Sequence, residues 1–365
     1  MKIECLLEKI KEALMVVEKV VGKNLTLPVL ESILFIAKDK KLTLRATNLS
    51  IGVEVSLNAN IEKEGIIAIK GNILSSLFSI IQNDTKVYLE KIGDNLQIKT
   101  KTNNILLKSI QHEDFPTIPV IKGEEIVINS SKFIEGLKSV YYSASVSEIK
   151  PEIGSVYVYG EDSNLIFVST DSFRLAEKKI KLKQNYSFDG VLIPFKNVVE
   201  IIKIFEGYEG DLKITLQKNQ ISISNSNIYL TSRIVDGIFP DYKQIIPKET
   251  KTEAVVLKQE LLSSLKISNI FSDKFNQINI LINPKQKIFK IKSKNIDIGE
   301  NDAILAGALT GDDISVNFNY KYIIDCFQSI TTDSISLSLS GDNKAMVVRA
   351  VGDPTFMYLV MPMNR

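Results

Sequence analysis

The sequence predicts an α+β protein with three tandem domains, each built from two strand-helix-strand-strand-strand modules. The clearest modules begin at Gly65, Gly190 and Ile314, where a short apolar strand leads into an amphipathic stretch of roughly ten residues and then into alternating strands. The distance between these copies exceeds the ~20 to 50 residues of solenoid repeats, so each pair of modules is expected to form a whole domain. The expected domains cover residues 1–122, 123–248 and 249–365.

The first half of each expected domain follows the same plan. The N-terminal half-domain opens with apolar residues at helical spacing and continues into the alternating stretches 32–39 and 41–47. The helical apolar positions are Leu6, Ile10, Leu14, Val17 and Val21. The corresponding helices of the other two domains are expected from Ser131 to about Ala144 and from about Lys258 to Asn269. Six modules are therefore expected in the whole chain.

The overall composition is that of an ordinary globular protein. Hydrophobic residues make up 44% of the chain, and the net charge is only +2, from 45 basic and 43 acidic residues. No apolar run reaches the ~18 residues that span a bilayer, and the N-terminus lacks a signal-peptide pattern, so we expect a cytoplasmic protein without a membrane partner. Cys5 and Cys326 lie inside amphipathic patterns, which favours buried thiols over a disulfide. The small net charge is unlike that of strongly basic nucleic-acid-binding proteins. If the protein binds DNA, the binding must therefore depend on where individual charges are placed.

Residue patterns that support catalysis are missing from the sequence. The one histidine, His112, lies in the polar run QHED and is expected at the surface. The chain has no HExxH spacing, nucleophile elbow, phosphate-binding glycine loop or paired cysteines. The run Thr170-Asp171-Ser172 has no neighbouring base that would activate a nucleophile. We therefore predict that the protein is not an enzyme and has no catalytic residue, metal or cofactor.

Four segments carry a resemblance to a known family. They are TLPVLESILF at 26–35, STDSFRLA at 169–176, FPDYKQIIP at 239–247 and YLVMPMNR at 358–365. In this order, they resemble the bacterial DNA polymerase III beta subunit family, the sliding clamps, and the resemblance extends along essentially the whole chain. It implies DNA-clamp domains assembling as a ring: a head-to-tail homodimer that encircles duplex DNA and tethers the replicative polymerase for processive synthesis.

The resemblance also implies a binding site for short, largely apolar partner peptides in a cleft between the second and third domains. Methionine and leucine side chains form an adaptable apolar surface, and Arg174 is expected to bind backbone carbonyls or an acidic group at its rim. By position, the expected peptide-binding residues are Ile153, Thr170, Ser172, Phe173, Arg174, Leu175, Pro240, Gln244, Ile245, Leu359, Met361, Pro362 and Met363.

The expected helices also carry the residues assigned to DNA. Ten lysines and seven acidic residues on these helices leave +3 per chain, which favours weak, salt-sensitive contact with phosphates and retention by topology. The expected DNA-facing residues are Lys9, Lys132, Lys138, Lys196, Lys203, Lys266 and Lys321. The expected dimer interface joins Ile105 and Leu107 of one protomer to Ile270 and Phe271 of its partner.

Four places depart from the family pattern, one of them the segment Lys150-Pro151-Glu152, which lacks the tyrosine pair seen in some members. Asn24 and Phe195 stand where basic residues are familiar, and Gln244 replaces a commonly basic residue at the cleft rim. These departures bear on which residues contact DNA and on how acidic a preferred peptide is.

Several classes of partner are implied by the resemblance. They are the DNA polymerase III alpha subunit and other polymerases, the clamp-loader complex, and mismatch-repair and ligase-type clamp-binding proteins. Two other hypotheses predict different behaviour. A repeat-domain scaffold would bind proteins without being retained on circular DNA, and an enzyme would need a cluster of titratable groups that the sequence does not contain.

Overall fold

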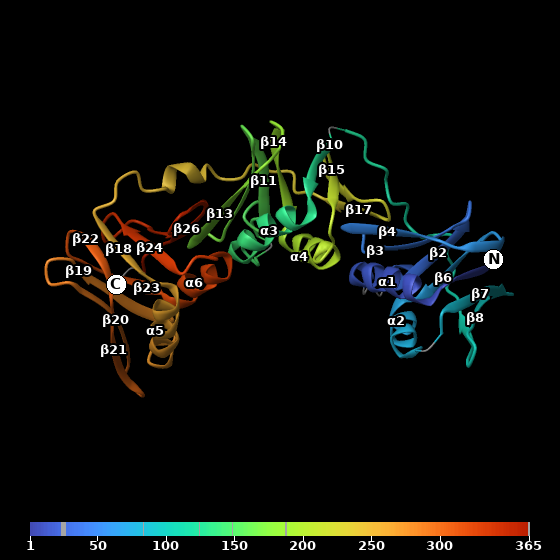
Figure 1. Cartoon of the computed structure of the whole chain (residues 1–365), viewed down its shortest axis with the longest axis horizontal. Helices are drawn as coiled ribbons and strands as arrows, with labels where there is room; N and C mark the ends of the chain where they lie inside the picture. Colours follow the sequence, from blue (N-terminus) through green and yellow to red (C-terminus); the bar gives the residue numbers. More distant parts are fainter. Residues whose placement is uncertain (23–26, 83, 124, 148, 187, 364–365) are drawn as a thin grey trace. The chain divides into compact units, whose positions relative to one another are not determined.

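The computed structural model describes residues 1–22, 27–82, 84–123, 125–147, 149–186 and 188–363. Contacts between residues divide the chain into two compact units, which are considered separately below. The first unit comprises residues 1–131 and 199–234, and the second comprises residues 132–198 and 235–365. Figure 1 labels many of the elements of both units. The expected central domain thus contributes strands to each unit.

The first unit contains two complete modules and strands from a third and a fourth. The first module is β1 (Lys2–Leu6), α1 (Leu7–Val17), β2 (Ser32–Lys38), β3 (Lys41–Thr47) and β4 (Ile51–Asn58). After the short β5 (Asn60–Lys63), the second module is β6 (Gly65–Lys70), α2 (Gly71–Ile80), β7 (Lys86–Ile92), β8 (Asn95–Lys99) and β9 (Asn104–Lys108). The other strands are β10 (Glu125–Asn129), β15 (Asp211–Gln217), β16 (Gln220–Ser224) and β17 (Ile228–Arg233).

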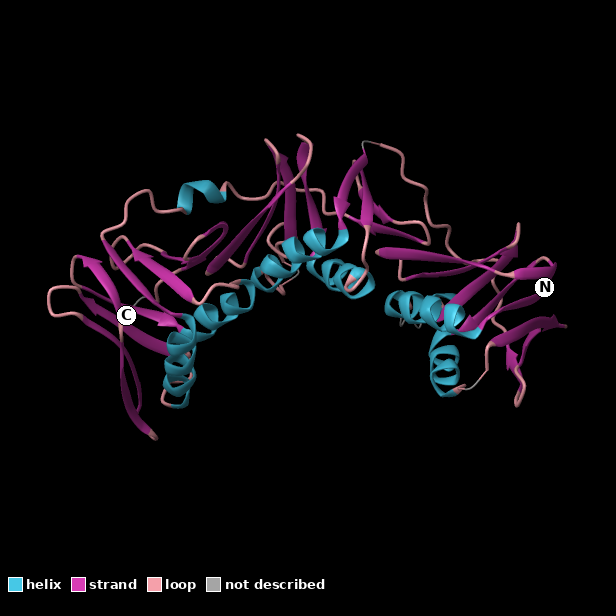
Figure 2. Ribbon diagram, viewed as in Figure 1, coloured by secondary structure: helices cyan, strands magenta, loops and turns pink. Residues whose placement is uncertain are grey.

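Two antiparallel sheets form this unit. The larger has the strand order β10-β15-β16-β17-β4-β3-β2-β6, and the smaller has the order β5-β1-β7-β8-β9. Helix α1 packs on β3 and β4 and against α2, so that its apolar stripe is buried. Figure 2 shows α1 and α2 on the same side of the strands. The pairing of β17 with β4 joins strands from two expected domains in one sheet.

The second unit repeats this construction. Its strands from the expected central domain are β11 (Ser155–Glu161), β12 (Asn164–Thr170), β13 (Arg174–Lys181) and β14 (Phe188–Pro194). The fifth module is β18 (Thr252–Leu257), α5 (Lys258–Ile270), β19 (Gln277–Asn283), β20 (Ile288–Asn295) and β21 (Gly299–Leu305), followed by β22 (Gly307–Gly311). The sixth is β23 (Ile314–Asn319), α6 (Tyr320–Asp325), β24 (Ser334–Leu339), β25 (Met346–Ala350) and β26 (Asp353–Val360). Helices α3 (Ser130–Val140) and α4 (Phe195–Phe205) have residues in both units.

The sheets of the second unit are also antiparallel. Their orders are β14-β11-β12-β13-β26-β25-β24-β18-β22 and β21-β20-β19-β23. Helix α5 packs on β20 and β21 and against α6, and both helices lie on one side of these strands in Figure 2. The β13–β26 pairing corresponds to the β4–β17 pairing of the first unit, because each joins the last strand of one module to the last strand of another.

The predicted fold class and the order of six modules are confirmed, while three helix boundaries differ from expectation. Val21 was expected on the first helix, but α1 ends at Val17 and a 3₁₀ turn covers only Glu18–Val20. Leu6 was expected on the first helix, but it ends β1 opposite Lys86 and is 47% exposed. Its backbone belongs to the β1–β7 pairing, so the helix begins at Leu7. The helix expected to reach Ala144 ends at Val140 and tightens into a 3₁₀ turn, Tyr141–Ser143.

Both cysteines are buried free thiols. Burial raises the pKa of Cys5 to about 12 and also raises the pKa of Cys326, so neither forms a reactive thiolate near neutral pH. Within the described residues, no helix has the length and apolar character to cross a bilayer.

Candidate functional site

The motif STDSFRLA forms a tight turn between β12 and β13. The Asp171 carboxylate accepts hydrogen bonds from the backbone N–H groups of Phe173 and Arg174, both at 3.0 Å. The Thr170 hydroxyl donates to the Arg174 carbonyl at 2.6 Å and accepts from the Ser172 N–H at 3.1 Å. Ser172 has a positive φ of 77°. Because short polar side chains bond the backbone of such turns, this sequence fixes the direction in which Phe173 projects.

Arg174 is held within the chain by two carboxylates and one ring. Its Nε donates to Asp171 at 2.9 Å, and its Nη1 pairs with Asp325 of α6. The guanidinium carbon lies 4.9 Å from the ring centroid of Tyr322, and the Arg174 side chain is only 13% exposed. The expectation that Arg174 binds backbone carbonyls or an acidic group of a ligand stays a prediction. Both acidic contacts are internal, and the arginine fixes the turn to α6.

An exposed aromatic side chain stands above this ion pair. Phe173 is 59% exposed and stacks on Tyr322, with ring centroids 6.2 Å apart and planes inclined by 15°. A phenylalanine that is exposed but held by a neighbouring ring is pre-organised for contact with an apolar ligand, since its rotamer is already restricted.

The C-terminal segment lies along the same turn. Leu175 pairs with Leu359 across β13 and β26, and the Met361 N–H donates to the Phe173 carbonyl at 2.8 Å. The Met363 N–H donates to the Asn317 carbonyl at 2.8 Å. Met361, Pro362 and Met363 are half-buried. Backbone hydrogen bonds therefore hold half-buried Met361 beside Phe173 and half-buried Met363 beside Asn317.

A buried apolar cluster supports this surface from below. Leu175 and Leu359 belong to it, with Met361 packed at its edge. The other members are Tyr159, Ile166, Val168, Leu192, Phe239, Tyr242, Ala345, Val347 and Met357. The rings of Tyr157 and Phe239 stack at 4.9 Å, which fixes the segment FPDYKQIIP against the cluster.

The segment FPDYKQIIP contributes both buried and exposed side chains. Tyr242 is buried, and its hydroxyl is bonded to Glu177 and, at 2.8 Å, to Tyr159. Pro240, Gln244 and Ile245 are exposed, Ile245 by 50%. The Gln244 amide donates to Asp241 at 2.7 Å. Burial raises the pKa of Tyr242 well above its usual range, and the Glu177 hydrogen bond raises it further.

Most of the expected peptide-binding residues lie on the turn between β12 and β13 or at the end of β26. The segment FPDYKQIIP packs against the same buried apolar cluster as these two elements. Ile153 lies in the loop before β11, where its carbonyl accepts from the Ser145 N–H. The sequence analysis missed Tyr322, Asp325 and Val347, which orient or support the expected residues. The first two lie on α6, about 150 positions from Arg174, and no local pattern predicts that pairing.

The seven expected DNA-facing lysines are all exposed on helices. They lie on α1, α3, α4, α5 and α6. Lys9 pairs with Glu12 at 2.8 Å, and Lys203 pairs with Glu200 at 3.0 Å, so part of their charge is balanced locally. Phe195 and Asn24 stand where basic residues are familiar in the family. Phe195 begins α4 and stacks on Tyr141, and Asn24 lies outside the described residues.

The expected dimer residues lie near two sheet edges. Strand β9 ends the smaller sheet of the first unit, and β21 ends the smaller sheet of the second. Ile105 and Leu107 are half-buried, whereas Leu106 between them is 58% exposed. Ile270 is 60% exposed, but Phe271 is half-buried beside Gly299. The sequence analysis did not single out Leu106 or Ile304, which are the more exposed apolar residues on these strands.

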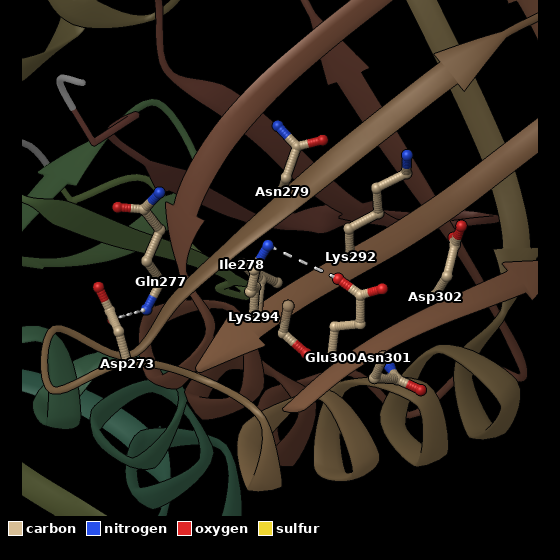
Figure 3. A pocket seen from close by; sticks show the side chains of 10 residues that line it. Asp273, Gln277, Ile278, Asn279, Lys292, Lys294, Glu300, Asn301 and Asp302 are labelled. Carbon is tan, nitrogen blue, oxygen red and sulfur yellow. Dashed lines mark hydrogen bonds and ion pairs between the residues drawn. The ribbon is translucent and has the colours of Figure 1, made fainter. Parts of the chain in front are cut away.

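A polar hollow of about 340 Å³ lies on the sheet that contains β21. Figure 3 shows Asp273, Lys294 and Glu300 among its lining side chains. Lys294 and Glu300 are 3.9 Å apart, and Lys290 and Asp302 on the same strands are 3.4 Å apart. These exposed ion pairs contribute little stability. Within the described part of the chain, no group of three or more potential metal ligands was found.

Comparison with protein families matches almost the whole chain to three domains of one family. Residues 1–119 match the N-terminal domain of the DNA polymerase III beta subunit, residues 127–241 its central domain, and residues 243–364 its C-terminal domain. The beta sliding clamp of Synechococcus elongatus is 25% identical, over 100% of this chain and 99% of the relative. That of Bacillus subtilis is also 25% identical, over 98% of each chain.

Solved structures agree with this assignment. The fold matches the Bacillus subtilis DNA polymerase sliding clamp with a TM-score of 0.95 at 23% identity, over 100% of this chain and 99% of that one. It matches the Pseudomonas aeruginosa clamp, solved with griselimycin bound, with a TM-score of 0.95 at 24% identity and full coverage of both chains. The DNA polymerase III beta subunit of Thermotoga maritima gives a TM-score of 0.94 at 24% identity, over 100% of this chain and 99% of that one.

Proposed function

Because the chain belongs to the DNA polymerase III beta subunit family, the bacterial sliding clamps, we propose that it encircles duplex DNA as a head-to-tail homodimeric ring. In this function it tethers the replicative polymerase for processive synthesis and performs no catalysis of its own. The observation that carries the proposal is the match to all three domains in order, together with an exposed, pre-organised apolar surface around Phe173.

The proposed partner site is the surface formed by Phe173, Ile245 and Met361–Met363. Phe173 and Ile245 are more exposed than apolar side chains in a protein core, and a buried apolar cluster packs against the same elements. Methionines at its edge adapt to different apolar ligands. Because two internal carboxylates already pair with Arg174, apolar contacts and backbone hydrogen bonds, rather than an ion pair, would supply most of the affinity.

Peptide binding is tested with a fluorescent peptide of the Gln-Leu-x-Leu-Phe type. We expect saturable binding to the full chain and at least tenfold weaker binding to Phe173→Ala, since a central aromatic anchor contributes about 2 kcal/mol. Deleting residues 361–365 removes the Met361 contact with Phe173 and should abolish binding. Tyr88→Ala is the matched control, because Tyr88 is a 47% exposed aromatic residue of the first unit. Unchanged affinity in both site variants would exclude this surface.

The proposed dimer uses the edges of β9 and β21. Each edge presents backbone groups that a strand of another chain can pair with, and each carries an exposed apolar residue, Leu106 or Ile304. Ile270, at the end of α5, adds a third exposed apolar side chain. Apolar residues in these positions are best explained by burial in a partner.

Light scattering tests the dimer. Leu106→Glu and Ile270→Glu each place an unpaired charge in the proposed interface, so we expect folded monomers. Both residues are exposed within the chain, and the variants should therefore keep the thermal stability of the protomer. Phe271→Glu is a poorer test, since Phe271 is half-buried against Gly299 and its loss would also affect folding. Intact dimers in the first two variants would place the interface elsewhere.

Retention on DNA separates the clamp from a protein scaffold. With few net positive charges on its helices, the protein should bind linear duplex weakly and lose it readily as salt increases. After loading by a clamp loader, it should stay on closed circular DNA at high salt and leave when the circle is cut. Equal retention on linear and circular DNA would contradict encirclement. The proposed partners are the polymerases, clamp loader and repair proteins that such a clamp serves.

A further inference from the structure

The turn that carries Phe173 has a second copy in the first unit. The Asn48 side-chain oxygen accepts from the Ser50 and Ile51 N–H groups at 3.0 and 2.9 Å. The Thr47 hydroxyl donates to the Ile51 carbonyl at 3.0 Å and accepts from the Leu49 N–H at 3.1 Å. These bonds repeat, one for one, those made by Asp171 and Thr170. The residue with positive φ is Leu49, at 74°, in the place of Ser172 at 77°.

The surroundings of the two turns also correspond. Strand β17 pairs with β4 as β26 pairs with β13. The Arg233 N–H donates to the Ser50 carbonyl at 2.8 Å, as the Met361 N–H donates to the Phe173 carbonyl at 2.8 Å. In both units a Phe-Pro dipeptide, 115–116 or 239–240, begins the segment that follows the last strand of a module. The first unit therefore contains the backbone of the proposed partner site.

A pocket of about 460 Å³ lies on this second copy. It is lined by the turn, by residues 116–119 and by the end of β17 at Thr231–Arg233. Its chemistry differs from that of the first site at equivalent positions. Ser50 replaces Phe173, Thr231 replaces Leu359, and Arg233 replaces Met361. Among the described lining residues Arg233 is the charged one, and its side chain is exposed.

Leu49 gives a second, independent sign of a ligand. It is 40% exposed at the pocket and has a left-handed backbone conformation, which leucine adopts at a cost and asparagine or glycine adopts readily. Unfavourable backbone conformations that persist in this way are concentrated at binding sites.

We propose that this pocket is a second peptide site, which binds an extended acidic segment of a partner protein. A carboxylate of the segment pairs with Arg233, and an aliphatic side chain packs on Leu49. The choice of a peptide as the ligand rests on the proposed function. A clamp that holds one partner at the Phe173 surface can hold another partner at the Leu49 pocket. The charge of the lining selects a different peptide, so that the two sites need not compete.

Fluorescence anisotropy with the full chain tests the proposal. The probe is a labelled hexapeptide, Asp-Leu-Asp-Leu-Asp-Gly, and the comparison peptide carries lysine in place of aspartate. We expect saturable binding of the acidic peptide only, weakened about tenfold or more in Arg233→Glu through loss of a charge-assisted contact. Leu49→Asn keeps the turn and should weaken binding severalfold. Lys99→Glu makes the same charge change on an exposed strand residue of the first unit away from the pocket, and should leave binding unchanged.

The deletion of residues 361–365 separates the two sites. Binding of the acidic peptide should survive this deletion, whereas binding of the Gln-Leu-x-Leu-Phe peptide should be lost, and Arg233→Glu should have the opposite pattern. Absence of acidic-peptide binding, equal binding by Arg233→Glu, or loss of binding in the deletion would overturn the second site. If only the Gln-Leu-x-Leu-Phe peptide fails to bind, the proposed partner site is wrong while the second site stands.

Discussion

The turns at Thr47–Ile51 and Thr170–Arg174 have equivalent hydrogen bonds to their backbones. They differ in the ion pairs that connect each turn to the rest of its unit. In the second unit, Asp171 also pairs with Arg174, which in turn reaches Asp325 on α6. In the first unit, Asn48 occupies the place of Asp171 and Ile51 that of Arg174, so the corresponding ion pairs have no counterpart at these positions. The comparison teaches that a repeated module can keep its backbone hydrogen bonds while its side chains diverge.

The segment after the Phe-Pro dipeptide differs in the same way. In the second unit it buries Tyr242, whose hydroxyl is bonded to Glu177. In the first unit Ile118 is buried close to Gly52, and a Cβ on that glycine would lie 3.0 Å from the Ile118 side chain. The contact between Ile118 and Gly52 is tight and needs no polar partner. The contact between Tyr242 and Glu177, in contrast, depends on the protonation state of the tyrosine hydroxyl.

The largest expected difference between the two turns is the loss of folding stability when the side chain that accepts the backbone hydrogen bonds, Asp171 or Asn48, is removed. Asp171→Ala removes two backbone hydrogen bonds and leaves the largely buried Arg174 with one carboxylate fewer. We expect a loss of about 3 kcal/mol, since breaking a buried ion pair is costly. Urea unfolding measures it. A loss under 1 kcal/mol would mean that Asp325 alone secures the turn.

Tyr242→Phe tests the polar contact below the proposed partner site. It leaves the buried Glu177 without one donor, which should cost about 2 kcal/mol at neutral pH. The pKa of Tyr242 is raised in the folded state, so the folded protein binds more protons than the unfolded chain above the usual tyrosine pKa of about 10. Its contribution is therefore fully present below pH ~10 and falls by at most about 1.4 kcal/mol per pH unit above it.

Unfolding of wild type and Tyr242→Phe across that range measures the effect. The stability difference between the two proteins should narrow as the pH rises past about 10. A constant difference would show that the hydroxyl proton is not coupled to folding. Ile118 has no titratable group, so Ile118→Val should give a loss that does not depend on pH.

Asn48→Ala makes the milder test of the first turn. It removes the same two backbone hydrogen bonds as Asp171→Ala but breaks no ion pair. We expect a loss of about 1 kcal/mol, typical of a lost cap or turn side chain. Urea unfolding under the same conditions gives the comparison. A loss as large as that of Asp171→Ala would show that the ion pair adds nothing.

The smallest effect is expected for the residues with positive φ. Leu49→Asn should stabilise the protein by about 0.5 kcal/mol, because asparagine accepts the left-handed conformation more readily than leucine. Ser172→Asn should change stability less, since serine is not a bulky side chain. Thermal unfolding of both variants measures the difference. Destabilisation by Leu49→Asn would show that the leucine contributes to folding and would weaken the case for a ligand there.

The sequence alone determined the local structure of this protein. Alternating apolar residues predict its strands, helical spacing predicts the helices between them, and the repetition predicts six modules, because these periodicities follow from backbone geometry. Even there, Leu6 shows the limit: strand pairing, which links residues far apart in the chain, moved the helix start to Leu7. The turn at STDSFRLA is equally local, since Thr170 and Asp171 bond the backbone within four positions.

Only the tertiary structure decided how these modules share their sheets and which side chains meet. The β4–β17 and β13–β26 pairings join segments separated by more than 170 residues, and no local pattern specifies them. The partners of Arg174 and Phe173 on α6 are equally distant in sequence, so the internal ion pair and the stacked ring emerge only after folding. The equivalence of the Leu49 pocket and the Phe173 surface likewise depends on hydrogen bonds and strand pairings, because the side chains that line them have diverged.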